Sequence, residues 1–407
     1  MGICIKEALR LIQGSIKEVS FEIVSIENSG NRISAQDIYA KYSLPTYNNS
    51  AMDGYGVRLN DTTKIVDVID SIHAGSHKQT KIEDGQCIKI MTGARIPTSV
   101  QAVVPIEIIE TVEDTQSRVK LPQNIKDNQH IRFIGEDILK DDLLISKGDE
   151  INFATITLLA SQGITHIKVY RKPKVSVFTS GEELKLHYEK IEDYQVYNSN
   201  TPTLLQRVKE LGCEATFTGM AKDTVESLQE TITNSLHADF IITTGGVSVG
   251  DADFTKEAFD KSGMEVIFNG IDIKPGKPTV FGKIGTTYVL NLPGNPLASA
   301  LIFEVFGTSI IQSLSGSTDL HHNYIETKLS EELNNRKGKT TLVPGSYNGR
   351  VFTPSIKRLP GMVSVLNNCN SFMILNKNLT HINKDDFVKI IPINWKFFSK
   401  EKVDFFN

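Results

Sequence analysis

The pattern of hydrophobic positions predicts an α/β domain in the second half of the chain. From Pro173, KVSVFT forms a near-continuous apolar run, which is typical of a strand buried on both faces. CEATFTGM, ADFIITT and MEVIFNG predict further strands, and PTVFGK with TYVLNL predicts a hairpin-like pair. Between the strands, TPTLLQRVKELG places its apolar residues on one face of a helix that ends at Gly212. Strands alternating with helices predict right-handed crossovers and a mostly parallel, three-layer sheet.

Two other helices in this region have recognisable starts. DTVESLQETITNSL begins with a D-x-x-E pattern, Asp223 to Glu226, which is typical of a capping box. PGNP precedes a long apolar helix that reaches residue 314, with Asn295 placed to cap it and Pro296 at its first position.

The rest of the chain has mainly the spacing of short strands. Residues 1–20 fit an amphipathic helix, and residues 151–163 predict a second helix closed by Gly163. From Leu44 to about Gly148, strand-like runs are separated by Gly, Pro, Asn and Asp clusters, which predicts a small all-β domain. Three compact loops lie there: NNSAMDGYGV, MTGARIP and RFIGEDIL. After about residue 316, the short β-like runs ETKLSEEL, TTLVPGSY, RVFTPSI and DFVKIIPI predict a terminal β domain.

Composition narrows the class of protein. The 407 residues are 40% hydrophobic and 23% charged, with 44 Lys+Arg against 48 Asp+Glu, which is an ordinary globular balance. We expect a cytoplasmic protein that binds neither membrane nor nucleic acid, because the chain lacks a long apolar run, a signal-like start and a basic tract. The four cysteines are far apart and form no CxxC, which argues against a disulfide framework or a zinc site.

The loop TTGGVSVGDAD is the most informative stretch. It leaves the carboxyl end of a predicted strand, where ligands bind in parallel α/β sheets. Gly245 and Gly246 allow the backbone to approach a ligand and turn its N–H groups toward an anion, and Ser248 adds a hydroxyl donor. Asp251 and Asp253 suit a divalent cation or the N–H-rich edge of a heterocycle. A plain βα turn is the alternative, and the combination of residues favours a site.

Three further loops carry candidate groups on the same domain. In IKPGKP, Lys274 and Lys277 flank a stiff Pro-Gly pair, and LPGNP lies between a strand and a helix. Together they look like an anion pocket, although each alone is more often a turn. In TSGEEL, the Ser180 hydroxyl and either Glu182 or Glu183 could face the same crevice. For this motif alone, a helix cap with acidic first-turn residues is the better interpretation.

The β section presents three isolated polar residues in its loops. They are Asp53 in SAMDGYG, Thr92 in MTGARIP and Asp137 in GED. Asp-Gly and Thr-Gly pairs are common turn chemistry, so the pattern alone gives these residues little weight.

Seven motifs together resemble one family. SAMDGY, MTGA–IP, GEDI, TSGEEL, GGVSVG–AD, IKPGKP and LPGNP occur in the order and approximate spacing of the molybdopterin molybdenumtransferase family, which includes bacterial MoeA and the C-terminal region of gephyrin. The resemblance covers nearly the whole chain. It implies a multidomain α/β plus β protein that forms an elongated homodimer. The implied domains are a discontinuous linker domain (1–43 and 138–170), an inserted β domain (44–137), a three-layer α/β molybdopterin-binding domain (171–315) and a C-terminal β barrel (316–407).

The resemblance also implies a reaction and its residues. The family inserts molybdate into the dithiolene of adenylylated molybdopterin, with loss of AMP and assistance from Mg²⁺. Its site lies between the α/β domain of one protomer and the inserted domain of the other, and contact with the adenylyltransferase of the same pathway is a further expectation. The implied catalytic residues are Asp53, Thr92, Asp137, Glu183 and Asp253, of which Glu183 and Asp253 are also the metal ligands. The implied residues for the pterin nucleotide and molybdate are Ser180, Gly245, Gly246, Ser248, Gly250, Asp251, Lys274, Lys277, Pro293, Gly294 and Asn295.

The chain departs from the family pattern at several positions. Gln101 and Asn48 replace family carboxylates, and Pro344 and Pro360 replace basic and Ser positions that the family links to molybdate. One alternative is therefore a paralogue that binds the pterin nucleotide but uses another oxyanion, such as tungstate, or has lost insertion. Another is a non-enzymatic scaffold, which would not need the charged residues that the chain retains.

Overall fold

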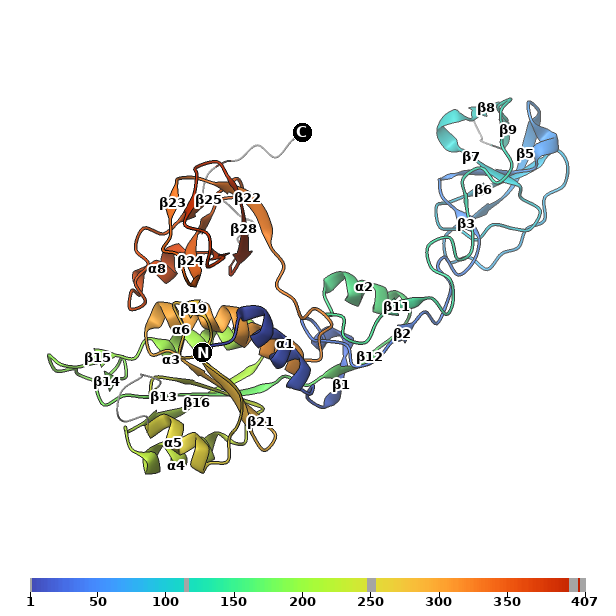
Figure 1. The fold of residues 1–407 in the computed structure, drawn as a ribbon. Helices are drawn as coiled ribbons and strands as arrows, with labels where there is room; N and C mark the ends of the chain where they lie inside the picture. The colour runs from blue at the N-terminus through green and yellow to red at the C-terminus, as the bar shows by residue number, and fades with distance from the viewer. Residues whose placement is uncertain (1, 113–116, 247–253, 395–401, 403–407) are drawn as a thin grey trace. The chain divides into compact units, whose positions relative to one another are not determined.

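The computed structural model describes residues 2–112, 117–246, 254–394 and 402. The chain divides into two compact units. Unit 1 comprises residues 1–36, 148–153 and 166–407, and unit 2 comprises residues 37–147 and 154–165. Figure 1 shows the elements of both units.

Unit 1 is built around a six-stranded sheet. In sheet order its strands are β16 (Glu214–Ala221), β13 (Lys174–Ser180), β17 (Phe240–Thr244), β21 (Thr287–Leu292), β20 (Val280–Ile284) and β18 (Glu265–Asn269). The first four are parallel, whereas β20 and β18 run antiparallel to their neighbours. The mostly parallel sheet and its terminal hairpin are therefore confirmed.

Helices cover both faces of this sheet, which gives three layers (Figure 1). One face carries α3 (Asn200–Glu210) and α6 (Pro296–Ile302); the other carries α4 (Val225–Ser235) and α5 (Phe254–Lys261), which pack on each other. Alternate residues of β17 enter the two cores, because successive side chains of a strand point to opposite faces. Phe240 and Ile242 join the core of α3 and α6, and Ile241 joins that of α4 and α5.

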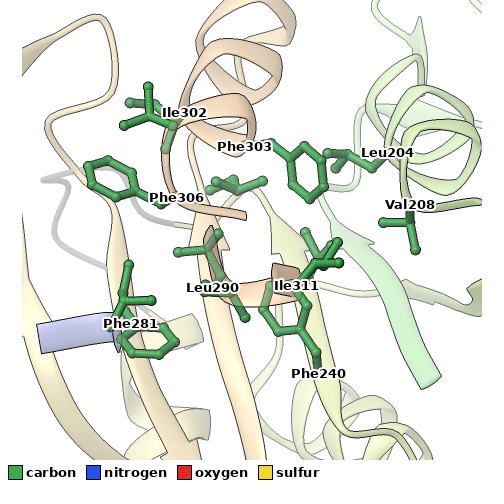
Figure 2. Close-up of a cluster of buried hydrophobic side chains, with 14 of the residues drawn as sticks. Leu204, Val208, Phe240, Phe281, Leu290, Ile302, Phe303, Phe306 and Ile311 are labelled. Carbon is green, nitrogen blue, oxygen red and sulfur yellow. The ribbon is translucent and has the colours of Figure 1, made fainter. Parts of the chain in front are cut away.

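The long helix predicted after PGNP is confirmed with one interruption. A π-helical turn at Phe303–Gly307 separates α6 from α7 (Thr308–Leu314). Figure 2 shows Phe303 and Phe306 from this turn among the buried side chains that cover Phe240 and Leu290 of the sheet. Among the described residues, Pro296–Leu314 is the one helix long and apolar enough to cross a membrane, and 78% of that apolar stretch is buried in the unit.

The N-terminal segment of unit 1 packs beside α7. The predicted first helix is α1 (Ile5–Ser15), and its Ala8 and Ile12 belong to the same core as α7. It leads to β1 (Phe21–Ser25) and a 3₁₀ turn (Ile26–Asn28), and β1 pairs antiparallel with β12 (His166–Tyr170).

The C-terminal β domain is a closed five-stranded barrel. Its order is β24 (Thr340–Tyr347), β25 (Val351–Pro354), β22 (Ile325–Leu329), β28 (Phe387–Pro392) and β26 (Ser371–Leu375), and β26 pairs back with β24. Short elements complete it: β19 (Ile273–Lys274), which pairs with β24, β23 (Leu333–Asn334), β27 (His381–Ile382) and α8 (Ser364–Asn368). The predicted terminal β domain is confirmed, although β26 was not among the predicted strands.

Unit 2 contains a curled six-stranded sheet and, apart from α2 (Phe153–Ser161), only short helical turns among its described residues. The sheet order is β7 (Ala102–Pro105), β4 (Gly54–Val57), β6 (Gln86–Ile90), β5 (Ile65–Ile72), β9 (Arg118–Lys120) and β8 (Glu110–Thr111). Two short pairs and two 3₁₀ turns accompany it: β3 (Asn49–Ser50) with β10 (Ile131–Arg132), β2 (Ile38–Tyr39) with β11 (Leu143–Ile145), Leu59–Asp61 and Ile106–Ile108.

The prediction that NNSAMDGYGV is wholly a loop is wrong. Its last four residues are β4, which is buried between β7 and β6, and Asn49–Ser50 are β3. The glycines explain the error, because they lower strand propensity yet are needed for close strand approach here. A Cβ at Gly54 would lie 2.1 Å from the Val104 carbonyl oxygen.

Candidate functional site

A cavity of about 890 Å³ lies at the carboxyl ends of the parallel strands of unit 1. Four chain segments supply most of its lining: residues 179–184 after β13, residues 196–200 before α3, residues 244–246 after β17 and residues 293–296 after β21. This is the edge at which open α/β sheets bind ligands. The structure therefore brings Ser180, Glu183, Gly245, Gly246, Pro293, Gly294 and Asn295 together around one cavity.

The glycine loop approaches its neighbours too closely for side chains. Gly245 and Gly246 have φ of +96° and +64°. A Cβ on Gly245 would lie 2.6 Å from the Ser180 carbonyl oxygen, and one on Gly246 would lie 1.7 Å from Thr255 Oγ1. Only glycine fits these two positions without a shift of the backbone. The remaining loop candidates, Ser248, Gly250, Asp251 and Asp253, lie outside the described residues, so their roles stay predictions.

Hydroxyl groups from two adjacent strands meet at the base of the cavity. Thr179 Oγ1 donates to the Thr244 carbonyl oxygen at 3.0 Å and also lies 3.0 Å from Thr244 Oγ1. Ser180 Oγ is buried and has no hydrogen-bond partner among the described residues. A buried hydroxyl without a partner costs stability, so Ser180 is a candidate donor to a bound ligand.

Two carboxylates, Glu183 and Asp223, line the same cavity, and neither has the helix-cap role that its sequence motif predicted. Glu183 belongs to a turn followed by β14 (Leu184–Lys185), so the helix-cap interpretation of TSGEEL is wrong. Asp223 also lines the cavity, and its Oδ2 accepts from the Glu182 N–H at 3.4 Å. The cap of α4 is instead Thr224, whose hydroxyl accepts from the Ser227 N–H. The prediction that Asp223 caps α4 is therefore wrong, and Asp223 is part of the cavity lining.

A barrel segment, Pro360–Val363, closes one side of the cavity. The Pro360 carbonyl oxygen accepts from the Leu297 N–H at 3.0 Å, in the first turn of α6. Asn295 occupies the N-cap position as predicted, but its side chain makes no capping hydrogen bond. The start of α6 is thus held by the barrel. Gly361 and Val363 line the first cavity, whereas Pro360 and Met362 line a second one.

The second cavity, of about 900 Å³, is strongly basic. Its cationic lining residues are Lys274, Arg336, Lys337, Lys339, Lys357 and Arg358, and its described lining contains no carboxylate. Burial lowers the pKa of the Arg358 guanidinium, against the opposing effect of the Glu331 charge. Clustered cations of this kind attract an anion. Lys274 lines this cavity, whereas Lys277 is in the lining of neither cavity, so its part in an anion pocket stays a prediction.

Unit 2 brings two of its three candidates into contact. Both the backbone N–H and the hydroxyl of Thr92 donate to Asp53 Oδ1, at 2.7 and 2.6 Å. These hydrogen bonds, the side-chain one foremost, lower the pKa of Asp53. Asp53 is therefore an exposed, oriented carboxylate that is ionised at neutral pH. Asp137 is also exposed, and no described hydrogen bond or ion pair joins it to Asp53 or Thr92.

Two residues that replace family carboxylates have structural roles in unit 2. Asn48 Oδ1 accepts from the Ile134 N–H at 2.9 Å, and Gln101 Oε1 accepts from the Leu59 N–H at 3.1 Å. Each amide side chain thereby holds a loop next to a candidate segment. In this chain, neutral amide groups therefore order the two loops.

The fold and the cavities define a multidomain α/β protein with an anion-suited ligand site. Its N-terminal part matches the family described as MoeA N-terminal region (domain I and II) at residues 3–163, and residues 176–313 match a probable molybdopterin binding domain. The chain belongs to the molybdopterin molybdenumtransferase family, as the seven motifs predicted.

Individual relatives match over most of their length. A molybdopterin molybdenumtransferase from Haemophilus influenzae is 34% identical, with 92% of this chain and 94% of that protein covered. One from Staphylococcus epidermidis is 30% identical, with 98% of each chain covered. A solved structure of the molybdopterin biosynthesis MoeA protein from Pyrococcus horikosii has a TM-score of 0.82 and 28% identity, covering 97% of this chain and 100% of that one. The predicted combination of α/β domain, β domain and barrel is confirmed by this likeness.

Proposed function

We propose that this protein inserts molybdate into the dithiolene of adenylylated molybdopterin and releases AMP. The observation that carries the proposal is the pair of neighbouring cavities in unit 1, one with a glycine loop and one basic, which share the segment Pro360–Val363. The names of the relatives, molybdopterin molybdenumtransferase, support the same reaction.

The residues of the first cavity suit an adenylylated pterin. The Gly245–Gly246 loop suits a pyrophosphate, because glycine lets the main chain approach an anion; the Gly245 N–H donates to the Leu292 carbonyl oxygen at 3.4 Å, so the Gly246 N–H is the donor that we assign to the ligand. The carboxylate of Asp223 suits the N–H-rich edge of a pterin. The second, basic cavity has Lys274 in its lining and suits the molybdate oxyanion.

The two buried cysteines, Cys87 and Cys213, do not suit a metal-ligand role. Burial raises the pKa values of Cys87 and Cys213 to about 12, so neither is a thiolate at neutral pH. In the proposed reaction the dithiolene sulfurs of the substrate hold molybdenum, which removes the need for a protein thiolate.

Mg²⁺ is part of the proposal. Magnesium prefers carboxylate oxygens together with substrate phosphates, and Glu183 offers such a carboxylate at the cavity wall. Asp253, the second proposed ligand, lies outside the described residues. The ion would neutralise charge on the pyrophosphate when AMP leaves.

Reconstitution with purified components tests the function. Protein, adenylylated molybdopterin and Mg²⁺ are mixed with molybdate, with tungstate or with neither, and AMP and the metal-loaded cofactor are measured. We expect AMP release that depends on molybdate and on Mg²⁺. Release with tungstate alone would favour the paralogue with altered oxyanion use. Binding of the nucleotide without release under any condition would favour lost insertion activity, and no binding would favour the scaffold.

We also propose a cytoplasmic homodimer whose sites are shared between protomers, in contact with the adenylyltransferase of the pathway. The Asp53–Thr92 pair belongs to unit 2, whereas the glycine-loop cavity belongs to unit 1. A two-fold dimer would give two equivalent composite sites, each using both chains.

Complementation tests the shared site. Asp53→Ala and Glu183→Ala chains are each expected to be inactive, and mixing them should restore up to about half of wild-type activity per heterodimer, because one of two sites then has both intact halves. Tagged pull-down verifies subunit exchange, and AMP release measures activity. Exchange without recovered activity would contradict the shared site.

A further inference from the structure

The chain between β13 and α3 forms a short excursion, residues 181–199, that brings Tyr197 to the first cavity. In it, β14 pairs in parallel with β15 (Val196–Tyr197). Tyr197 lines the cavity and is 46% exposed. Tyr194, in the same excursion, is 70% exposed but does not line the cavity.

The Tyr197 side chain is held at both ends. Its hydroxyl donates to the Glu189 carbonyl oxygen at 3.1 Å. Its backbone neighbours are also fixed: the Val196 N–H donates to the Glu183 carbonyl oxygen at 2.9 Å, and the Asn198 N–H donates to that of Lys185 at 2.8 Å. The ring is therefore oriented before any ligand arrives, which reduces the entropy lost on binding.

Asn198 makes this corner rigid. It is buried, and its Oδ1 accepts from the Thr201 N–H at 3.1 Å while its Nδ2 donates to Thr201 Oγ1 at 2.9 Å. Both polar ends of the amide are thus satisfied within the first turn of α3. Because Tyr197 precedes Asn198 in the chain, its backbone is held close to the first turn of α3.

The Tyr197 ring has no stacking partner in the described part of the chain: no other ring or cationic group there packs against it. Two more exposed apolar side chains line the same cavity, Phe254 at 39% and Val363 at 51%. An oriented aromatic face and apolar surface beside a polar glycine loop suit a flat, partly polar ring.

We propose that Tyr197 stacks on the planar nitrogen heterocycle of the bound nucleotide. This inference rests on the proposed function, because it assumes a ligand that joins a heterocycle to phosphate. Adenine and pterin have the required chemistry in common: each presents a flat π-face. Tyr197 is then a positioning residue, and the glycine loop recognises the charged part of the ligand.

Calorimetry with three probes tests the proposal in the full chain. The probes are AMP, neopterin as a pterin without adenylate, and pyrophosphate, which has no ring. Tyr197→Leu is expected to raise the Kd of AMP, of neopterin or of both by about 5- to 150-fold, the range for loss of one aromatic–base stack, and to leave that of pyrophosphate unchanged. Tyr197→Phe keeps the ring without its hydroxyl tether and should lose less affinity. Tyr194→Leu is the matched control and should resemble wild type.

The probes also identify the ring and separate this inference from the proposed function. An effect on AMP alone would assign Tyr197 to adenine, and an effect on neopterin alone would assign it to pterin. Wild-type binding that is unchanged in Tyr197→Leu would overturn the stacking proposal while leaving the function intact. An equal loss of pyrophosphate affinity would also overturn it, because the residue would then act on the fold. A wild-type chain that binds none of the probes and not the adenylylated pterin would contradict both.

Discussion

Replacing Gly246 with alanine is expected to weaken nucleotide binding by about tenfold or more and to lower the free energy of unfolding by about 2–4 kcal/mol. The new Cβ would lie 1.7 Å from Thr255 Oγ1 and 2.8 Å from Thr255 Cβ, and Thr255 is buried. The left-handed φ of +64° adds a backbone penalty for alanine. Either the loop or the start of α5 must therefore move, and this changes the lining of the cavity at Gly245 and Gly246.

Gly263→Ala separates the cost of the left-handed backbone from the cost of the close contact with Thr255. Gly263 has a similar φ of +77°, but a Cβ there would meet nothing within 4 Å, and the residue does not line the cavity. This variant should lose about 1–2 kcal/mol of stability through its backbone alone and keep wild-type affinity. Calorimetric titration with AMP and urea unfolding measure the two quantities. If Gly246→Ala and Gly263→Ala bind AMP equally well, the close approach of the loop is not needed for binding.

Gly54→Ala is expected to destabilise the curled sheet of unit 2 by about 3 kcal/mol or more. The Cβ would lie 2.1 Å from the Val104 carbonyl oxygen and 2.8 Å from its carbon, both of which are main-chain atoms of β7. Because β4 pairs with β7 and β6 at once, β4 cannot move away from one neighbour without disturbing the other. Hydrogen exchange of the β4 and β7 amides in the full chain measures the change locally.

Gly14→Ala provides the control for this substitution. Gly14 lies in α1, and a Cβ there would meet nothing within 4 Å. Alanine should stabilise that helix by about 0.5–1 kcal/mol. Exchange in β4 that is as slow in Gly54→Ala as in Gly14→Ala would show that the sheet accommodates the added methyl group.

The sequence predicted the α/β domain well because its strands are buried on both faces. Such strands are continuous apolar runs, as at β13, and they need no knowledge of their neighbours. β4 could not be found this way, since Gly54 fits the close approach of β7 but has low strand propensity. β26 closes the barrel by pairing with β24, and no strand was predicted at residues 371–375.

The residues of the candidate site also differ in how well the sequence predicted them. The glycine loop was predictable because it combines unusual residues at a strand end, and the structure places Gly245, Gly246 and Glu183 around one cavity. Asp223 and Tyr197 were not predicted as cavity residues. Asp223 lies in a sequence that is typical of a helix start, and Tyr197 acquires its position only through the fold of the excursion.

The segment Pro360–Val363 also limits how this sequence can vary. Its successive residues line the two cavities alternately, so a point substitution there alters the chemistry of one cavity at a time. Insertion or deletion of one residue would instead exchange the side chains presented to both and shift the carbonyl oxygen that holds α6. A substitution in this segment can therefore change the lining of one cavity and leave the other as it is, whereas a change in its length alters both at once.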